Sequence, residues 1–360
     1  MLKKRTILLA PLDWGLGHAT RCIPIIKMLQ ELSCTVIIAA EGPTQQILSQ
    51  AFPSITCLPL QGYHIEYSRK KSRFAFKILI QIPKIMGVIY KEHRWLKKVV
   101  KKYAVDAIIS DNRFGFYHHS VPSVYITHQL AIQTGNSITD KLAQIIHFHF
   151  IKKYTQCWVP DFEGKENLAG NLSHPKVVPS NTNYIGCLSR FQSTPFVKKM
   201  YDVVIVISGP EPQRTIFENL LLNQLIHFTG KILLVRGLPG SKVVTPSVNI
   251  NNLEVHAHLS AHQLNLVIQQ AQMVICRSGY TTVMDLIKLQ QKAIMVPTPG
   301  QVEQEYLATY LFEKEIYYSI SQHEFFLQTA LDAAANFPYH FPIFNMEQYE
   351  IKITQFVSNL

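Results

Sequence analysis

Small and hydroxyl-bearing residues interrupt an apolar run in the last third of the chain. Residues 273–276 are apolar, Ser278 and Gly279 follow, and apolar residues resume with helical spacing from Val283. This pattern predicts a buried strand that turns into a helix. A helix N-terminus presents backbone N–H groups and a partial positive charge, so it favours an anion such as a phosphate. Asp285 lies about one and a half turns into this helix, where a carboxylate can hold ribose hydroxyls.

A histidine and an aspartate follow two predicted strands in the first half. His18 lies in the glycine-rich turn after residues 6–12, and Asp111 follows residues 107–110. Ligands of open parallel sheets bind at the carboxyl ends of strands, so we expect both residues at one edge. A carboxylate bonded to one imidazole nitrogen orients the ring and stabilises its protonated form, as a base that deprotonates a hydroxyl requires. The alternative is that His18 caps a helix and Asp111 caps a turn.

Polar residues also follow two predicted strands of the second half. Ser208 and Gly209 end one strand, and Gln213 and Arg214 open the helix after it. Backbone N–H groups and a cation at this point can bind a diphosphate. Arg236 ends the next strand at the same edge and could approach the nucleotide. Arg214 has an alternative role, which is to pair with Glu211 at the surface.

The segment from Cys276 to Glu305 resembles the donor site of the MurG-like (glycosyltransferase family 28) and UDP-glycosyltransferase families. It has a strand, Ser-Gly-x-x-Thr, an acid three residues later, a short strand ending in Pro297, and a Gln-rich loop. The resemblance implies the α/β fold named GT-B, in which two Rossmann-like domains have parallel sheets that face across a cleft. It also implies a set of donor contacts: Asp285 for the ribose, Ser278, Gly279, Thr281 and Thr282 near the diphosphate, and Gln304 and Glu305 near the sugar.

The same families imply roles for the first half. Their first turn faces the acceptor, and a His and Asp pair placed like His18 and Asp111 acts as the catalytic base. The expected acceptor contacts are Gly15, Gly17, Asn112 and His128. His128 is included because it follows a predicted strand at the same sheet edge, and it could equally be a satisfied loop histidine. The implied reaction is an inverting, metal-independent transfer from a nucleotide-sugar, with UDP-sugar expected, to a hydroxyl acceptor. No cofactor and no metal are expected.

Alternative functions start from other residues. Gly15 and Gly17 begin a dinucleotide fingerprint that has Thr20 in place of its third glycine and Glu41 as a candidate acid, which would suit an NAD-dependent oxidoreductase. A non-catalytic nucleotide-sugar-binding protein on the same fold is another possibility. A 2-epimerase would need further acids that the sequence does not identify. The histidines at 256, 258 and 262 have no carboxylate cluster beside them, so we expect no metal site there.

Length and composition agree with two α/β domains. The chain has 360 residues, of which 47% are hydrophobic, enough for two cores. We place the junction near Gly186, with an acceptor domain at 1–186 and a donor domain at 187–343. The similarity to GT-B proteins implies that a last helix, within 344–360, crosses back to the first domain. Six scattered cysteines predict reduced core residues rather than a disulfide framework.

Apolar runs and their spacing predict the elements that position these residues. The expected strands are 6–12, 34–40, 55–60, 107–110, 123–127, 157–160, 184–188, 202–207, 232–235, 273–276, 293–297 and 316–320. The expected helices are 22–32, 43–52, 74–100, 141–154, 213–228, 283–289, 301–313, one from 324, and 346–357.

The positive charge is concentrated in one segment. The net charge is +11, and residues 69–102 contain twelve Lys or Arg against one acid, Glu92. Apolar residues recur there at helical spacing, and Pro83 is expected to break or kink the helix. This favours a basic amphipathic helix at an anionic membrane, with a solvated basic face as the alternative. Binding to nucleic acid is not expected, because the segment lacks the spacing of known motifs.

The N-terminus imitates the start of a signal peptide. Asp13 interrupts its apolar run and no cleavage site follows, and no run has the length of a membrane span. We therefore expect a cytoplasmic protein, with peripheral association at the inner face of the membrane as the alternative. Neutralising Lys70, Lys71, Lys97 and Lys98 should weaken its binding to anionic vesicles.

Overall fold

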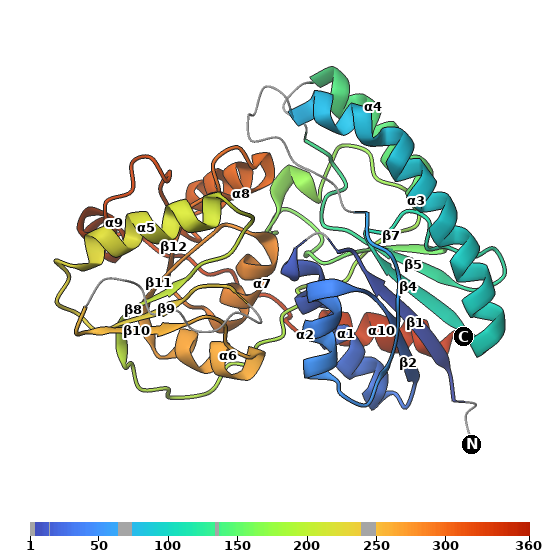
Figure 1. Cartoon of the computed structure of the whole chain (residues 1–360), viewed down its shortest axis with the longest axis horizontal. Coiled ribbons are helices and arrows are strands. Elements are labelled where there is room, and N and C mark those ends of the chain that lie inside the picture. Colours follow the sequence, from blue (N-terminus) through green and yellow to red (C-terminus); the bar gives the residue numbers. More distant parts are fainter. Residues whose placement is uncertain (1–3, 14, 64–73, 134–136, 239–249) are drawn as a thin grey trace. The chain divides into compact units, whose positions relative to one another are not determined.

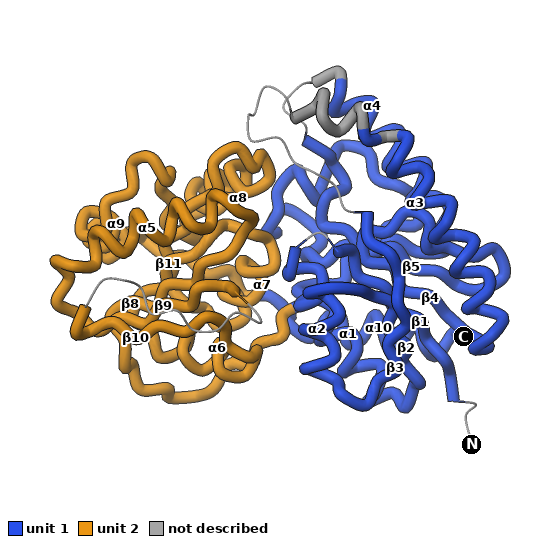
Figure 2. The backbone as a smooth tube through the Cα atoms, viewed as in Figure 1, with its two compact units in different colours: residues 1–188, 344–360 blue, residues 189–343 orange. Residues whose placement is uncertain are grey.

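The computed structural model describes residues 4–13, 15–63, 74–133, 137–238 and 250–360. The chain forms two compact units (Figure 2): Met1–Leu188 with Phe344–Leu360, and Ser189–Ile343. Each unit has a parallel sheet with helices on both faces (Figure 1), which confirms the expected α/β class. The boundary after Leu188 lies close to the junction that we place near Gly186.

The sheet of the first unit has the order β3-β2-β1-β4-β5-β6-β7, and every neighbouring pair is parallel. Its strands are β1 (Thr6–Pro11), β2 (Thr35–Ala39), β3 (Thr56–Leu58), β4 (Ala107–Asp111), β5 (Ser123–Ile126), β6 (Gln156–Val159) and β7 (Thr182–Tyr184). The strand expected at 184–188 instead ends at Tyr184. Gly186 adopts a φ of 77° in the following turn, a conformation that is incompatible with a continuing strand.

Five α-helices belong to the described part of the first unit: α1 (Leu16–Glu31), α2 (Gly42–Ala51), α3 (Phe74–Tyr103), α4 (Ser137–Ile151) and α10 (Gln348–Ser358). Of the two effects expected of Pro83, a break is absent, because α3 runs through this residue. Pro83 is exposed, and an exposed carbonyl that loses its helical hydrogen bond can be solvated. No helix within the described ranges is both long enough and apolar enough to cross a bilayer.

The C-terminal segment packs on the first unit through aromatic rings. The ring of Phe344 stacks on that of Phe162 at a centroid distance of 3.8 Å, and Phe356 meets Trp158 edge-on at 5.3 Å. Gln348 Nε2 donates to the carbonyl of Tyr184 at 3.1 Å. These contacts hold residues 344–360 on the unit that contains β6 and β7.

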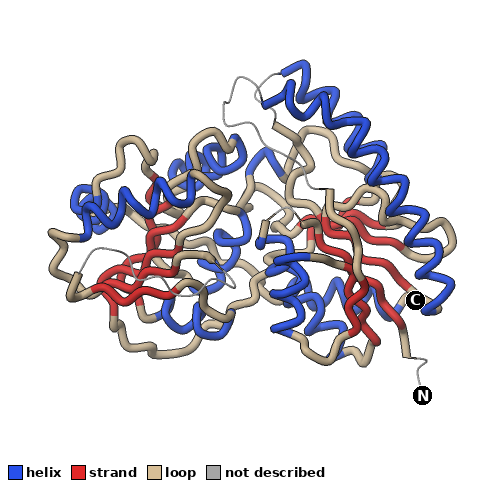
Figure 3. Tube along the Cα trace, in the orientation of Figure 1, coloured by secondary structure: helices blue, strands red, loops and turns tan. Residues whose placement is uncertain are grey.

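The sheet of the second unit has the order β10-β9-β8-β11-β12-β13, again with parallel neighbours. Its strands are β8 (Tyr201–Val206), β9 (Ile232–Val235), β10 (Leu253–His256), β11 (Ala271–Cys276), β12 (Ala293–Met295) and β13 (Tyr318–Ser319). Its helices are α5 (Gln213–Leu225), α6 (Ala261–Gln269), α7 (Tyr280–Leu289), α8 (Val302–Glu313) and α9 (Leu327–Ala335). Figure 3 shows the strands of each sheet in red and the helices around them in blue.

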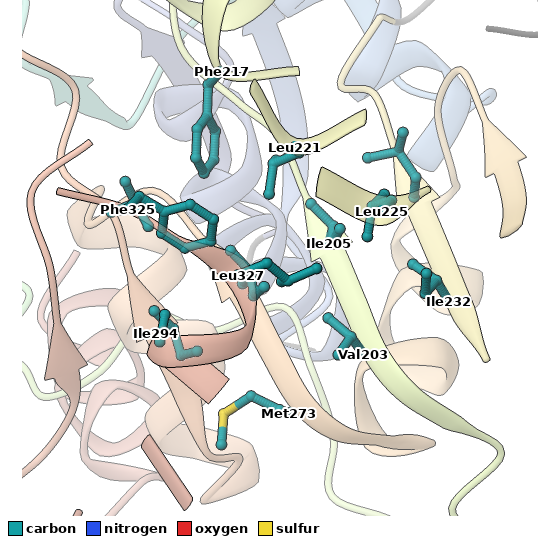
Figure 4. Packing of buried hydrophobic residues seen from close by; sticks show 14 of the residues in the cluster. Val203, Ile205, Phe217, Leu221, Leu225, Ile232, Met273, Ile294, Phe325 and Leu327 are labelled. Carbon is teal, nitrogen blue, oxygen red and sulfur yellow. The ribbon is translucent and has the colours of Figure 1, made fainter. Parts of the chain in front are cut away.

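A core of buried side chains holds α5 and α9 on one face of the second sheet. Val203, Ile205 and Ile294 come from strands, whereas Phe217 and Leu327 come from the helices (Figure 4). Strand residues buried on both faces explain why β8 and β11 appear in the sequence as continuous apolar runs. The six cysteines are free thiols, and all except the half-buried Cys57 are buried, as expected.

Candidate functional site

The strand order creates a topological switch point at the carboxyl edge of the first sheet. β1 pairs with both β2 and β4, so the connections from β1 and β4 leave in opposite directions. Ligands of open α/β sheets bind at such a switch point. α1 begins directly after β1 and carries His18 in its first turn, while Asp111 is the last residue of β4.

The two residues paired on sequence grounds are in contact. His18 Nδ1 lies 3.1 Å from Asp111 Oδ1. The Asp111 carboxylate is fully buried, whereas 13% of the His18 side chain remains exposed. The pair therefore has the geometry in which a buried carboxylate orients a histidine ring that a ligand can reach.

Arg21 is a third member of this cluster that our sequence analysis missed. Its Nε donates to Asp111 Oδ2 at 2.7 Å, and its Nη2 forms a second bond to Asp111 Oδ1. Nη2 also lies 2.8 Å from His18 Nδ1, and Nη1 lies 3.1 Å from His128 Nδ1. The available signal was its position three residues after His18, because i and i+3 side chains share a helix face.

Arg21 sets the charge balance of the cluster. Burial favours the protonated form of Asp111, but Arg21 and His18 outweigh this effect and hold the pKa of Asp111 below its ordinary value. Burial and Arg21 lower the pKa of His18, and Asp111 opposes them by raising it. Because the lowering effects prevail, His18 is neutral at pH 7, which is the form that a base needs.

The protonation of Nδ1 decides what His18 can do. With a proton there, the ring donates to Asp111 and leaves Nε2 free to accept a proton from a ligand. With the proton on Nε2, Nδ1 accepts from Arg21 instead, and the ring cannot act as a base. Asp111 favours the first tautomer and Arg21 the second.

Two of the proposed acceptor residues, Asn112 and His128, contact this cluster. The Asn112 amide, with its nitrogen toward Tyr125 and Thr127, donates to both hydroxyls at 3.1 Å, and its oxygen accepts from Arg21 at 3.3 Å. His128 lies in the loop after β5, where it is buried and contacts Arg21 through its Nδ1, so both its expected roles remain compatible with its position. Gly15 is the exposed N-cap residue of α1, with a φ of 85°, and Gly17 lies within the first turn of that helix.

The second unit has an equivalent switch point between β8 and β11. β8 pairs with both β9 and β11, and the helices that follow β8 and β11 begin at the same sheet edge. Ser208 and Gly209 are exposed after β8, and Gly279 is the N-cap residue of α7. Gly279 has no side chain to cap α7, which suits a helix N-terminus that binds an anion. At α5, in contrast, the Glu211 carboxylate accepts from the backbone N–H of Thr215 at 3.2 Å.

The two arginines expected to approach a nucleotide are paired with carboxylates. Arg214 Nε donates to Glu211 Oε1 at 2.6 Å, and its Nη1 donates to Glu218 Oε2 at 2.6 Å. Arg236 Nε donates to Glu218 Oε1 at 2.5 Å. The alternative pairing of Arg214 with Glu211 is therefore present, and these acids offset the positive charge that we assigned to a diphosphate.

Two residues expected near the sugar hold their own loop. The side chain of Gln304 accepts from the Thr298 backbone N–H at 2.9 Å, and Glu305 accepts from that of Gly300 at 2.9 Å. Ser278 Oγ donates to the carbonyl of Gln304 at 2.8 Å, so the loop is tied to the turn after β11. Thr281 and Thr282 are half-buried in the first turn of α7.

Asp285 is buried in α7 and contacts the start of the second unit. Its carboxylate accepts from Ser189 Oγ at 2.7 Å and pairs with Arg190, whose Nε lies 3.4 Å away. Burial raises the pKa of Asp285, and Arg190 and Ser189 oppose that effect. The sequence contained no signal for this contact, because the partners lie far apart in the chain.

His256 is one of the three histidines considered for a metal site, and it contacts a carboxylate of its own strand. His256 Nε2 lies 2.7 Å from Glu254 Oε1 on β10. Across the described ranges, no group of three or more His, Cys, Asp or Glu side chains could hold a metal ion.

The second unit matches a known protein family. Residues 204–346 match the model of the glycosyltransferase family 28 C-terminal domain. No curated protein sequence matches the chain. The family match does not favour the NAD-dependent alternative, which rested on Gly15 and Gly17.

Solved glycosyltransferase structures resemble the whole chain at low sequence identity. The kitacinnamycin glycotransferase has a TM-score of 0.63 at 12% identity, covering 99% of this chain and 96% of its own. The spinosyn rhamnosyltransferase SpnG complexed with thymidine diphosphate has a TM-score of 0.60 at 12% identity, with 99% and 96% coverage. MurG of Acinetobacter baumannii has a TM-score of 0.52 at 13% identity, with 98% and 95% coverage. These similarities establish the GT-B fold, and the second unit matches the C-terminal domain of glycosyltransferase family 28.

Proposed function

We propose that the chain is an inverting, metal-independent glycosyltransferase that moves a sugar from a nucleoside diphosphate sugar to a hydroxyl acceptor. The observation that carries this proposal is the contact of 3.1 Å between His18 Nδ1 and the buried Asp111 carboxylate. A neutral histidine held in this way is suited to take a proton from an acceptor hydroxyl. The first unit binds the acceptor, and the second unit binds the donor.

The chemical step follows from these roles. His18 Nε2 takes the hydroxyl proton while the acceptor oxygen forms a bond to the anomeric carbon. The bond between that carbon and the diphosphate oxygen breaks, and the nucleoside diphosphate leaves with the electron pair. Attack opposite the leaving group inverts the anomeric centre. Helix N-termini at α5 and α7 stabilise the charge that develops on the diphosphate, which is why no metal is required.

Donor recognition centres on Asp285 as the acceptor of ribose hydroxyls. We propose UDP-sugar as the first candidate donor. Thymidine diphosphate sugar is the second candidate, because the similar protein SpnG was solved with thymidine diphosphate. Gln304 and Glu305 remain the candidate contacts for the sugar.

A ligand panel tests this function. Thermal stabilisation would be measured with UDP, thymidine diphosphate, GDP and NAD, with magnesium and with EDTA, on the wild type and on Asp285→Asn. We expect a pyrimidine nucleoside diphosphate to stabilise the wild type equally in magnesium and EDTA, with a smaller effect on Asp285→Asn. Stabilisation by NAD alone would contradict the proposal, and binding without sugar transfer to any of a broad set of acceptors would favour a non-catalytic binding protein.

We further propose that α3 and α4 bind an anionic membrane surface. Ile89 of α3 and Phe150 of α4 share one buried cluster, so the helices pack together, and they lie side by side in Figure 1. Both carry exposed apolar side chains, namely Met86, Tyr90, Leu142, Ile145 and Ile146. Apolar insertion combined with basic charge is the way in which peripheral proteins bind anionic lipid.

The charge of α3 supports this proposal. Its described lysines and arginines after Pro83 are all exposed: Lys84, Lys91, Arg94, Lys97, Lys98, Lys101 and Lys102. Glu92 is buried and pairs with Arg113, so it does not offset them at the surface. Arg69, Lys70, Lys71 and Arg73 lie outside the described residues. The free thiols suit a reducing compartment, and we place the protein at the cytoplasmic face of such a membrane.

A further inference from the structure

Arg277 differs from the other buried arginines of the described chain. Its side chain is fully buried at the end of β11, directly before the turn formed by Ser278 and Gly279. The other fully or nearly fully buried arginines pair with carboxylates: Arg21 with Asp111, Arg113 with Glu92, and Arg214 with Glu211 and Glu218. No carboxylate among the described residues forms an ion pair with Arg277.

The partners of Arg277 are neutral groups from several turns. Its Nη1 donates to the carbonyls of Val296 at 3.1 Å and Pro297 at 3.2 Å, directly after β12. Its Nη2 donates to the carbonyl of Gln213 at 3.1 Å and to Gln322 Oε1 at 2.7 Å. Arg277 therefore ties together the first residue of α5, the end of β12 and the segment after β13.

An aromatic ring provides the remaining contact. The guanidinium carbon lies 4.2 Å from the centroid of Phe217, one of the core residues in Figure 4. The electron-rich ring face attracts the cation, and the carbonyl dipoles do the same. These groups stabilise the charge without neutralising it.

An unneutralised buried cation has an electrostatic consequence. Burial lowers the pKa of Arg277 to about 10, so the group is still charged at pH 7. Charges in a protein interior are poorly screened by water, and they are costly unless an opposite charge lies nearby. In contrast, Arg214 and Arg236 already have Glu211 and Glu218 beside them.

We propose that Arg277 is a positioning residue of the donor site whose charge is balanced by the diphosphate bound at the N-termini of α5 and α7. It acts through the turns that it holds and through its electric field, because a fully buried side chain does not touch the ligand. This inference rests on the proposed function. It assigns the main uncompensated positive charge to Arg277, where our sequence analysis assigned it to Arg214.

The discriminating measurement compares a charged ligand with its uncharged part. Isothermal titration would give the affinities of UDP and uridine, and of thymidine diphosphate and thymidine, for the wild type, Arg277→Gln and Arg277→Lys. We expect Arg277→Gln to weaken binding of the nucleoside diphosphate about 10- to 100-fold and binding of the nucleoside less than about threefold, because only the diphosphate interacts with the charge of Arg277. Arg277→Lys keeps the charge and should keep the ratio of the two affinities within about threefold.

Each outcome bears on the proposal. If Arg277 has a purely structural role, Arg277→Gln should weaken the binding of the diphosphate and of the nucleoside by the same factor. An unchanged ratio of the two affinities would therefore overturn the proposal. If Arg277→Gln does not fold, the folded variant Arg277→Lys decides. A large fall in the ratio of diphosphate affinity to nucleoside affinity overturns the proposal, and a preserved ratio supports it. A wild type that binds no nucleoside diphosphate overturns the proposed function along with this inference.

Discussion

The Ser189 hydroxyl donates a hydrogen bond of 2.7 Å to Oδ1 of Asp285, the carboxylate that we assign to the donor ribose. Arg190 Nε lies 3.4 Å from Oδ2, and only 4% of Asp285 is exposed. Both partners belong to the segment that directly follows the junction after Leu188. A ribose hydroxyl that binds Oδ1 either shares this oxygen with the Ser189 hydroxyl or replaces that hydroxyl, and we predict replacement because the buried carboxylate leaves little room for both.

Ser189→Ala should strengthen nucleoside diphosphate binding. The variant removes a hydrogen bond from the free protein that the ribose replaces in the complex. A bond to a charged acceptor contributes about 1.5 kcal/mol, so we expect the Kd to fall about tenfold. The free protein should unfold at a lower temperature, because Asp285 loses a partner. Isothermal titration and calorimetry measure the two effects.

Two control variants accompany this change. Ser189→Thr keeps the hydroxyl and should bind like the wild type. Asp285→Asn should weaken binding whether or not Ser189 is present, because the charged acceptor is lost. An unchanged Kd in Ser189→Ala would show that the ribose does not replace this hydroxyl.

His18→Gln should reduce turnover without affecting the donor site. A positioned base contributes about 10²- to 10⁴-fold, so we expect kcat to fall by that factor. The donor residues belong to the other unit, and the Kd of the nucleoside diphosphate should stay within about twofold of the wild type. Steady-state kinetics with an identified acceptor and titration calorimetry give both values. Near-wild-type turnover in His18→Gln would remove this residue from the mechanism.

The pH dependence of kcat/KM should report the neutral His18. Burial and Arg21 lower the pKa of His18, so the midpoint of the acidic limb should lie below the ordinary histidine pKa of about 6.5. Asp111→Asn removes a group that raises this pKa, so the limb should move to still lower pH while the rate falls. A limb that moves upward in Asp111→Asn would contradict the assignment.

The same shift affects folding. A histidine whose folded pKa lies below its unfolded value binds fewer protons in the folded state, so its burial destabilises the protein as the pH falls below about 6.5. His18→Gln should remove this contribution. Unfolding temperatures of the wild type and the variant, compared between pH 5 and pH 7.5, measure it.

Ile145→Asp should weaken binding to anionic vesicles. This side chain is 68% exposed on α4, and inserting a carboxylate opposes both apolar burial and attraction to anionic lipid. We expect about a tenfold loss of affinity for vesicles with 30% phosphatidylserine, measured by co-sedimentation. Lys97→Gln with Lys98→Gln should have a similar effect, at about 1 kcal/mol for each lysine near the surface.

Ile351→Asp is the matched control for the membrane surface. Ile351 is 52% exposed on α10 in the same unit, but it lies outside α3 and α4. It should bind vesicles like the wild type. Equal binding by all the variants would mean that the basic face of α3 is only solvated.

The sequence alone predicted the α/β class, the strands and helices other than β10 and α6, and the edges of the two sheets at which His18, Asp111 and Ser278 lie. Buried strands require continuous apolar runs and their turns require glycine and hydroxyl residues, so periodicity and local composition carry this information. Side-chain pairing was decided only by the tertiary structure. Only the tertiary structure shows which residues pair: Arg21 with Asp111, Glu218 with Arg214 and Arg236, and Ser189 with Asp285. It also shows that Arg277 has no carboxylate partner in the described chain. Most of these contacts join residues far apart in the chain, and which charge neutralises which is set by distances of a few ångströms that local sequence patterns do not encode.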